Sequence, residues 1–308
     1  MKILITGGAG FIGSHLAAHF CGQGTKVRVL DNLRTGHRSN LIGLDVEFME
    51  GSILDRAMVG RAMEGIDVVF HLAAFVSVPE SVRDPQGCRE LNVTGFGHVL
   101  EAAAAARVKK LCFASSAAIY GDNPEVPKRE DMPPEPRSPY AETKLQGEVL
   151  CREFATAGRL ETVALRFFNV FGPRQDPSGP YGAAIPIFFR EALAGRPLKI
   201  FGDGGQTRDF IYVQDIVEAL AFVSARPGLT GVFNAGYGGQ ITVLELARRI
   251  LALTGSTSKI EFAPVRAGDV RDSRASIDRL RATGWKPAGS LEAGLEKTLA
   301  AWRAASPR

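Results

Sequence analysis

Short apolar runs alternate with longer amphipathic stretches through the first half of the chain. The apolar runs predict strands at 2–6, 26–30, 46–50, 67–72, 110–115 and 162–169, and the stretches between them predict helices at 12–22, 53–64, 86–106 and 139–157. Apolar strands that are separated by helices are typical of a parallel sheet that is covered on both faces. The pattern therefore predicts an α/β fold, a Rossmann-type doubly wound parallel sheet.

The pattern changes after Asn169. Residues 172–186 are rich in Gly and Pro and are expected to form a loop. A helix is expected at 183–194, one more core strand at 232–235, and a further helix after Thr242, which has Glu245 at the capping-box spacing. We therefore predict two domains: 1–170, to which 213–240 returns, and a smaller C-terminal lobe built from 171–212 and 241–308.

A glycine-rich segment directly follows the first predicted strand. Gly7, Gly10 and Gly13 have the G-x-x-G-x-x-G spacing, a variant of the dinucleotide fingerprint, and a helix is expected to begin at its end. Such glycines allow a tight turn and a close approach of a pyrophosphate to the free amides of the helix. Asp31 ends the second strand, where an acid binds both ribose hydroxyls and repels a 2′-phosphate. The segment predicts NAD rather than NADP, a preference that the nearby Arg34 weakens slightly.

Tyr140 and Lys144 are four residues apart on a predicted helix, so their side chains share one face. Ser138 is expected to cap this helix, and Pro139 suits its first turn. A free tyrosine has a pKa of about 10, and bringing it near 7 requires roughly 4 kcal/mol. A cation about 4 Å away supplies that much at an effective dielectric constant near 20. The pair therefore predicts a proton shuttle, although an exposed helix pair would show the same spacing.

The bulk properties agree with a soluble cytoplasmic protein. Hydrophobic residues make up 45% and charged residues 23% of the chain, so disorder is not expected. The net charge of +4 is spread out, which argues against nucleic-acid binding, and Lys109-Lys110 is interpreted as a solvated helix end. The four cysteines have no metal or redox spacing and fit buried or half-buried thiols in a reducing compartment. No metal site, secretion signal or membrane span is expected.

The order and spacing of several motifs resemble the extended short-chain dehydrogenase/reductase family and, within it, the nucleotide-sugar 4-epimerases. The resemblance covers nearly the whole chain. Its motifs are the glycine turn at 7–13, His71-Leu72-Ala73-Ala74, Asn92-Val93-Thr94-Gly95, Ser115-Ser116-Ala117-Ala118-Ile119-Tyr120-Gly121, Tyr140 to Lys144, Phe168-Asn169-Val170-Phe171-Gly172-Pro173-Arg174, Arg208-Asp209-Phe210 and Arg266-Ala267-Gly268-Asp269.

The resemblance implies a role for each site residue. It makes Ser116, Tyr140 and Lys144 catalytic. It implies that NAD binds Gly7, Gly10, Phe11, Ile12, Gly13, Asp31, Asn32, Ser52, Ile53, Leu72, Ala73, Ala74, Asn92, Tyr140 and Lys144. The implied substrate-binding residues are Ser77, Ser116, Tyr140, Asn169, Arg208, Arg266, Asp269 and Ser273. The plainer interpretations are a strand end for Ser116, a helix cap for Asn92, solvated arginines, and a packed core histidine for His71.

Two positions depart from the family pattern. Many relatives have an Asp-Ile or Asp-Leu pair after strand three, where this chain has Ser52 and Ile53, so a contact with adenine is weaker or absent. Some hexose epimerases have a lysine near position 76, which is Val76 here.

The residues after Ser116 indicate which reaction to expect. Similar dehydratases have Asp-Glu there and similar decarboxylases a Glu in this region, whereas this chain has Ala117 and Ala118. Epimerisation needs no additional acid or base, so we expect an NAD-dependent 4-epimerase that works through a 4-keto sugar. The nearer alternatives are a dehydratase or reductase, and the distant one is a non-catalytic dinucleotide-binding module.

Ser273 bears on the substrate. It falls where hexose-restricted relatives have a tyrosine and N-acetyl-tolerant relatives a small residue. We expect interconversion of UDP-GlcNAc and UDP-GalNAc alongside, or above, that of UDP-Glc and UDP-Gal, with UDP-glucuronate as an open alternative. The run of alanines after Glu101, together with the helix of Tyr140, is expected either to form a subunit contact of a homodimer, as in the family, or to pack on its own sheet.

Overall fold

The computed structural model describes residues 1–177, 183–265 and 270–305, and the chain forms two compact units. Unit 1 comprises Met1–Gly121, Pro133–Phe167 and Ile216–Phe233, and unit 2 comprises Asp122–Met132, Phe168–Asp215 and Asn234–Arg308. The assignment of a cofactor-binding and a substrate-binding role to two domains, with the predicted boundaries, stays a prediction.

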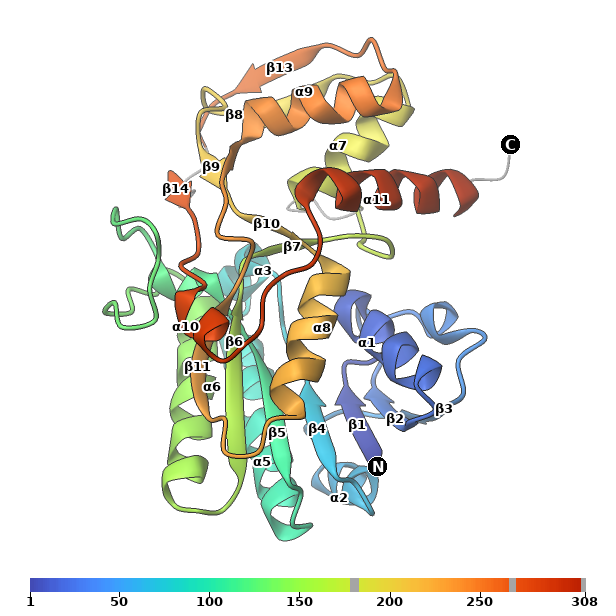
Figure 1. Cartoon of the computed structure of the whole chain (residues 1–308), viewed down its shortest axis with the longest axis vertical. Helices are drawn as coiled ribbons and strands as arrows, with labels where there is room; N and C mark the ends of the chain where they lie inside the picture. Colours follow the sequence, from blue (N-terminus) through green and yellow to red (C-terminus); the bar gives the residue numbers. More distant parts are fainter. Residues whose placement is uncertain (178–182, 266–269, 306–308) are drawn as a thin grey trace. The chain divides into compact units, whose positions relative to one another are not determined.

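Unit 1 is built around a seven-stranded sheet with the order β11-β6-β5-β4-β1-β2-β3 (Figure 1). The pairs from β6 through β3 run parallel, and the order from β3 to β6 is that of a Rossmann fold. This confirms the predicted fold class. The strands are β1 (Lys2–Thr6), β2 (Lys26–Asp31), β3 (Val46–Glu50), β4 (Val68–His71), β5 (Lys110–Ser116), β6 (Glu161–Phe167) and β11 (Gly231–Ala235).

Helices cover both faces of this sheet. Leu4, Val69 and Leu111 belong to the core on one face, which they share with buried residues of three helices: α2 (Arg56–Met63), α5 (Phe96–Ala105) and α6 (Pro139–Thr156). On the other face Phe20 of α1 (Phe11–Gly22) lies 5.2 Å from the ring of Phe70. The remaining helical segments are η1 (Arg38–Leu41), α3 (Val78–Arg83), α4 (Pro85–Arg89), η3 (Ala117–Tyr120) and α8 (Val213–Ser224).

Two features of unit 1 differ from the prediction. The expected helix at 86–106 is interrupted by a π-helical segment, η2 (Glu90–Gly95), between α4 and α5. Lys110 is not solvated but only 2% exposed, and its Nζ is bound by the Leu229 carbonyl at 3.2 Å and the Glu161 carboxylate at 3.2 Å. Its neighbour Lys109 is exposed and pairs with Asp67, as expected of a surface lysine.

Unit 2 has its own apolar core, in which Phe189, Leu198 and Leu246 are fully or almost fully buried. The helix after Thr242 is confirmed, since the Thr242 hydroxyl accepts from the Glu245 amide at 3.1 Å. Its small sheets pair β10 with β7, β13 with β8, and β9 with β12 and β14. The elements are β7 (Asn169–Phe171), α7 (Ala184–Leu193), β8 (Leu198–Phe201), β9 (Thr207–Arg208), β10 (Phe210–Tyr212), β12 (Ile241–Thr242), α9 (Val243–Thr254), β13 (Ile260–Ala263), β14 (Asp272–Ser273), α10 (Asp278–Ala282) and α11 (Leu291–Ala305).

Throughout the described ranges, no helix is long and apolar enough to cross a membrane.

Candidate active site

The glycine turn joins β1 to α1 at the carboxyl edge of the sheet. Gly7 has a φ of +72°, and a Cβ there would lie 2.6 Å from the Ala73 nitrogen. A Cβ on Gly13 would lie 2.2 Å from the Gly7 carbonyl oxygen. Gly10 precedes α1 without a side-chain cap, so no side chain competes for the first amides of the helix, at Phe11 and Ile12. Gly7 and Gly13 therefore let the turn pack closely against Ala73 and against α1, and the amides at the start of α1 have no side-chain cap.

Asp31 lies at the end of β2 beside this turn. Its carboxylate accepts from the Ala9 amide at 2.9 Å and from the Leu33 amide at 2.8 Å, so it ties the turn to β2. Arg34, which weakens the predicted preference for NAD, forms an ion pair with Glu80 and lies 4.3 Å from the Phe75 ring centre. The Arg34 guanidinium therefore has partners within the protein.

The other predicted cofactor residues of unit 1 follow the carboxyl ends of the strands. Leu72 and Ala73 come after β4 and donate to the Thr6 carbonyl at 3.0 Å and to its hydroxyl at 3.4 Å. Ser52 accepts from the Leu54 amide at 3.2 Å, and Ile53 is buried. Asn32, next to Asp31, is exposed, and Ala74, next to Ala73, is half-buried. The predicted substrate residue Ser77 is also half-buried and caps α3.

Tyr140 and Lys144 lie in the first turns of α6, as predicted. The Ser138 hydroxyl accepts from the Ala141 amide at 3.2 Å, and the buried Ser81 hydroxyl accepts from the Tyr140 amide at 3.2 Å. Lys144 donates to the Ala114 carbonyl at 2.8 Å, and its Nζ lies 5.8 Å from the Tyr140 ring centre. The Tyr140 phenol also forms a side-chain hydrogen bond with Ser116, the last residue of β5. The structure thus brings the three predicted catalytic residues together.

The pKa values of this pair correct one prediction. Burial raises the pKa of Tyr140, opposed by the hydrogen bond from Ser116, so Lys144 does not bring the pKa of the phenol down in the protein alone. Burial also lowers the pKa of Lys144 to about 8. The physical reason is that both groups lie in a desolvated site, where the charged form of each is disfavoured.

Asn92 lies inside η2 and is not a helix cap, so that interpretation is wrong. Its amide oxygen accepts from the Phe75 amide at 2.7 Å, and its Nδ2 donates to the Phe75 carbonyl at 3.1 Å and to the Thr143 hydroxyl at 3.0 Å. Because Thr143 precedes Lys144, Asn92 ties the segment after β4 to the helix that carries the predicted catalytic residues. π-helical segments within α-helices are frequent at functional sites.

His71 is a packed core histidine, as the plainer interpretation held. Its ring stacks on Phe96 with the centres 4.4 Å apart, and Nδ1 lies 2.8 Å from the Thr6 hydroxyl oxygen. Burial, with a smaller effect of Lys144, lowers its pKa to about 3, so it is neutral.

Three of the predicted substrate residues lie in the described part of unit 2. Arg208 on β9 is the register partner of Ser273 on β14, and both are half-buried. The Arg208 guanidinium donates to the Thr207 carbonyl at 2.8 Å. Asn169 donates from its side chain to the Asp209 carbonyl at 3.0 Å. Arg266 and Asp269 lie outside the described residues.

The comparisons with known proteins agree with this geometry. Residues 3–236 match the NAD dependent epimerase/dehydratase family. The chain is 40% identical over 310 residues to a UDP-glucose 4-epimerase of Mycolicibacterium smegmatis, which covers 98% of this chain and 99% of that one. The chain belongs to the NAD-dependent epimerase/dehydratase family. The resemblance inferred from the motifs is confirmed.

Solved structures of this family have the same fold. The UDP-glucose 4-epimerase of Thermotoga maritima, determined with UDP-glucose, superposes with a TM-score of 0.95 at 40% identity and covers 99% of each chain. A UDP-N-acetylglucosamine 4-epimerase from Methanobrevibacter ruminantium M1, in complex with UDP-N-acetylmuramic acid, does so with a TM-score of 0.95 at 36% identity and 99% coverage of each chain.

The residues present fit the NAD of this family. Gly7 and Gly13 allow the tight turn that this site requires, because a Cβ at either would collide with backbone, and the uncapped start of α1 carries the partial positive charge that an anion needs. Asp31 supplies a carboxylate at the end of β2, the position that binds ribose hydroxyls in this fold.

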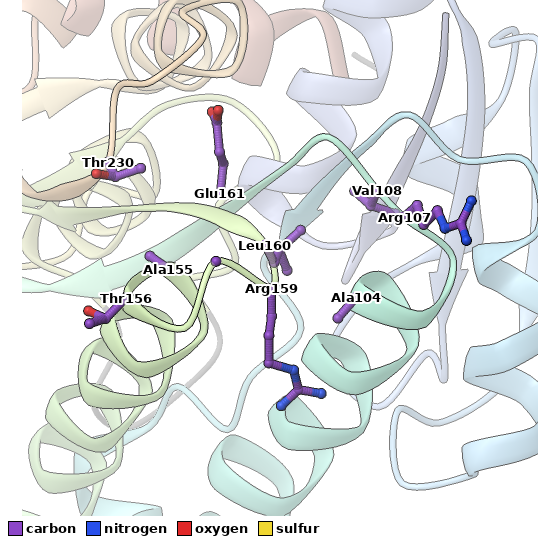
Figure 2. A pocket seen from close by; sticks show the side chains of 10 residues that line it. Ala104, Arg107, Val108, Ala155, Thr156, Arg159, Leu160, Glu161 and Thr230 are labelled. Atoms are coloured by element: carbon purple, nitrogen blue, oxygen red, sulfur yellow. The ribbon is translucent and has the colours of Figure 1, made fainter.

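A hollow of about 470 Å³ lies at the amino ends of β5 and β6, where residues such as Val108, Arg159 and Glu161 line it (Figure 2). Ligands of open parallel sheets bind at the carboxyl ends of the strands, where Ser116 lies. We therefore assign no catalytic role to this hollow.

Sequence reasoning missed some residues that shape the site. Ser81 holds the first free amide of α6, and Asp209, noted only as part of a motif, is 1% exposed and accepts from the amides of Tyr237, Gly238 and Ala275. The signal for Asp209 was its place in an Arg-Asp-Phe motif, where a charged residue between strand residues has to find buried donors.

Proposed function

We propose that the protein is an NAD-dependent 4-epimerase of UDP-sugars that works through a transient 4-keto sugar. The observation that carries this proposal is the arrangement of Tyr140, Ser116 and Lys144, one proton-transfer group with its two supports, in a chain of the NAD-dependent epimerase/dehydratase family. The UDP-sugar specificity rests on the names of the relatives, which extend over almost the whole chain.

Bound NAD supplies the acceptor and donor of a hydride at C4 of the sugar. Tyr140 takes the proton from the 4-hydroxyl. It returns this proton to the same oxygen after the keto sugar has rotated to present its other face. Ser116, which hydrogen bonds with Tyr140, is placed to bond that oxygen and to fix the direction of proton transfer. Lys144 places a positive charge beside the phenol when the phenolate forms.

The residues next to Ser116 argue for epimerisation over elimination. Ala117 and Ala118 begin η3 directly after β5, at the positions where similar dehydratases have an acidic pair. An alanine side chain cannot transfer a proton, so no group at these positions is available to expel water from the keto sugar. Epimerisation needs no such group, because the keto sugar only has to take the hydride back on its other face.

We assign the UDP-sugar to the predicted residues of unit 2. Arg208 presents a guanidinium suited to a diphosphate, and its register partner Ser273 is small enough to leave room for a 2-acetamido group. We propose that UDP-GlcNAc and UDP-GalNAc are interconverted alongside, or above, UDP-Glc and UDP-Gal. UDP-glucuronate is the alternative substrate, because a small residue also suits it.

We further propose that the protein acts as a cytoplasmic homodimer. Cys88, Cys112 and Cys151 are free and buried and Cys21 is half-buried, in keeping with a reducing compartment. Light scattering on a sizing column and fractionation of cells would test the two statements separately.

The decisive experiment incubates purified protein separately with UDP-GlcNAc, UDP-Glc and UDP-glucuronate, without added nucleotide and with added NAD. We expect C4 epimers without net NADH, and none from a Tyr140→Phe variant. Accumulation of a 4-keto-6-deoxy sugar, or a requirement for NADPH, would reject the proposal in favour of a dehydratase or a reductase. NAD binding without turnover of any of the three sugars would favour the non-catalytic module.

A further inference from the structure

A buried ion pair lies one helical turn beyond Lys144. The Glu148 carboxylate on α6 accepts from Arg166 on β6 in a two-pronged contact, Nε to Oε1 at 2.9 Å and Nη2 to Oε2 at 2.8 Å. The Glu148 and Arg166 side chains are 5% and 6% exposed. The Ser115 hydroxyl on β5 donates to the same Oε1 at 2.6 Å, and Ser115 and Arg166 are register partners.

This pair extends a regular set of contacts between β5 and α6. Tyr140, Lys144 and Glu148 are four residues apart and share one face of α6. They contact three consecutive residues of β5: Tyr140 the Ser116 side chain, Lys144 the Ala114 carbonyl, and Glu148 the Ser115 hydroxyl. Two of the three contacts involve catalytic residues, and only the third carries no chemistry of its own.

The third contact is built for geometry more than for stability. A buried ion pair costs desolvation and is often no more stabilising than apolar residues of the same volume. A two-pronged guanidinium–carboxylate contact, in contrast, fixes distance and direction. The Arg166 guanidinium also lies 4.8 Å from the ring centre of Tyr120 in η3, so four elements, α6, β5, β6 and η3, meet at this pair.

We infer that Glu148 and Arg166 are positioning residues, which clamp α6 to the ends of β5 and β6 so that Tyr140 and Lys144 meet Ser116 at the reacting distance. The inference rests on the proposed epimerase function. Neither residue touches the reacting atoms. Their effect passes through Ser115 on the strand and through one turn of helix to Lys144.

Several titratable groups surround Lys144, so a test has to separate an electrostatic effect of the ion pair from a geometric one. Cys88 on α4 and Cys151 and Glu148 on α6 act on Lys144, and Lys144 in turn acts on His71 of β4. With Arg166 in place, the Glu148 charge is compensated within the pair. Removing only the carboxylate therefore leaves an uncompensated cation near the catalytic pair, which favours the phenolate.

Two variants distinguish geometry from charge. Glu148→Gln removes the carboxylate. Arg166→Lys keeps the positive charge but loses the two-pronged guanidinium contact. We expect kcat to fall on the order of 10- to 100-fold in both, with KM for the UDP-sugar nearly unchanged, because small misplacements of reacting groups have costs of this size. The acidic limb of the pH profile of kcat should move to lower pH in Glu148→Gln and stay in place in Arg166→Lys.

The matched control lies at the other end of the same two strands. Lys110 of β5 and Glu161 of β6 are also register partners. They form a 3.2 Å ion pair in which the lysine is buried. Lys110→Met should lower the melting temperature but change neither kcat nor the pH profile. If Glu148→Gln does not fold, Ser115→Ala, which removes only one hydroxyl bond, should still lower kcat several-fold.

The outcomes are separable from those of the proposed function. Wild-type protein without epimerase activity would refute the function itself. With an active wild type, the positioning role is refuted if the folded Glu148→Gln and Arg166→Lys variants turn over within about twofold of wild type, or if Lys110→Met loses as much kcat as they do.

Discussion

Gly13→Ala probes the turn that carries the proposed cofactor site. The added Cβ would lie 2.2 Å from the Gly7 carbonyl oxygen and 2.7 Å from the Gly8 Cα. Ordinary contacts of a Cβ begin near 3.4 Å, so the turn and the start of α1 must separate by more than 1 Å. Both atoms belong to the backbone and cannot rotate away. Overpacking costs about 1–3 kcal/mol, and we expect the upper half of this range.

The same displacement should weaken NAD binding. If the turn relaxes in the free variant, NAD must restore the close approach before its pyrophosphate meets the amides of α1. A cost of about 1.4–2.8 kcal/mol corresponds to a 10- to 100-fold weaker affinity. Isothermal titration calorimetry with NAD and a thermal melt of the free protein measure the two effects.

Gly22→Ala is the control, since Gly22 ends the same helix and a Cβ there would meet nothing within 4 Å. This variant should be as stable as wild type or more stable by up to about 1 kcal/mol, with unchanged NAD affinity. Equal NAD affinity of Gly13→Ala and Gly22→Ala would contradict a role of the tight turn in NAD binding.

Three further predictions follow from single contacts. Lys144→Met removes a cation 5.8 Å from the Tyr140 ring centre, worth about 3 kcal/mol at a dielectric constant of 20, so kcat should fall about 100-fold or more in a steady-state assay, and less in Lys144→Arg. Ser273→Tyr should remove activity on UDP-GlcNAc while leaving that on UDP-Glc, and full activity on the acetylated sugar would contradict the assignment. Burial raises the pKa of Asp209 to about 6, against the hydrogen bonds from the amides of Ala275, Tyr237 and Gly238 that lower it, so its stabilisation is complete below about pH 4 and is lost as the pH rises through 6. Denaturant unfolding of wild type relative to Asp209→Asn should show a decrease of at most about 3 kcal/mol between about pH 4 and 7, and a constant difference would contradict it.

The sheet and the helix of Tyr140 and Lys144 could be predicted because their signals are local. Apolar runs end at turn residues, so β1 and β3 begin and end at the predicted residues. Ser138 and Pro139 mark the start of α6 through a cap and a missing donor, both of which the sequence contains.

Features that depend on distant residues could not be predicted in this way. Nothing near Asn92 in the sequence shows that its side chain joins Phe75 to Thr143, and the helix prediction therefore ran through η2. Lys110 looked like a surface lysine because the carbonyls that bury it lie more than 110 residues further along the chain. The Glu148–Arg166 pair likewise joins a helix to a strand that sequence spacing does not relate.

The pKa shifts of Tyr140 and Lys144, the predicted catalytic pair, could not be predicted from the sequence. The i, i+4 spacing placed a cation next to a phenol correctly, and Coulomb's law alone then predicted a depressed tyrosine pKa. Burial acts on both groups in the opposite sense, raising the pKa of Tyr140 and lowering that of Lys144 to about 8. Each charge is disfavoured by itself, so a phenolate at Tyr140 depends on several supports at once: the Ser116 hydrogen bond, a protonated Lys144, and the positive charge of a bound nicotinamide. Variants of Ser116 and Lys144 should therefore be non-additive, because each removes a support that the other needs.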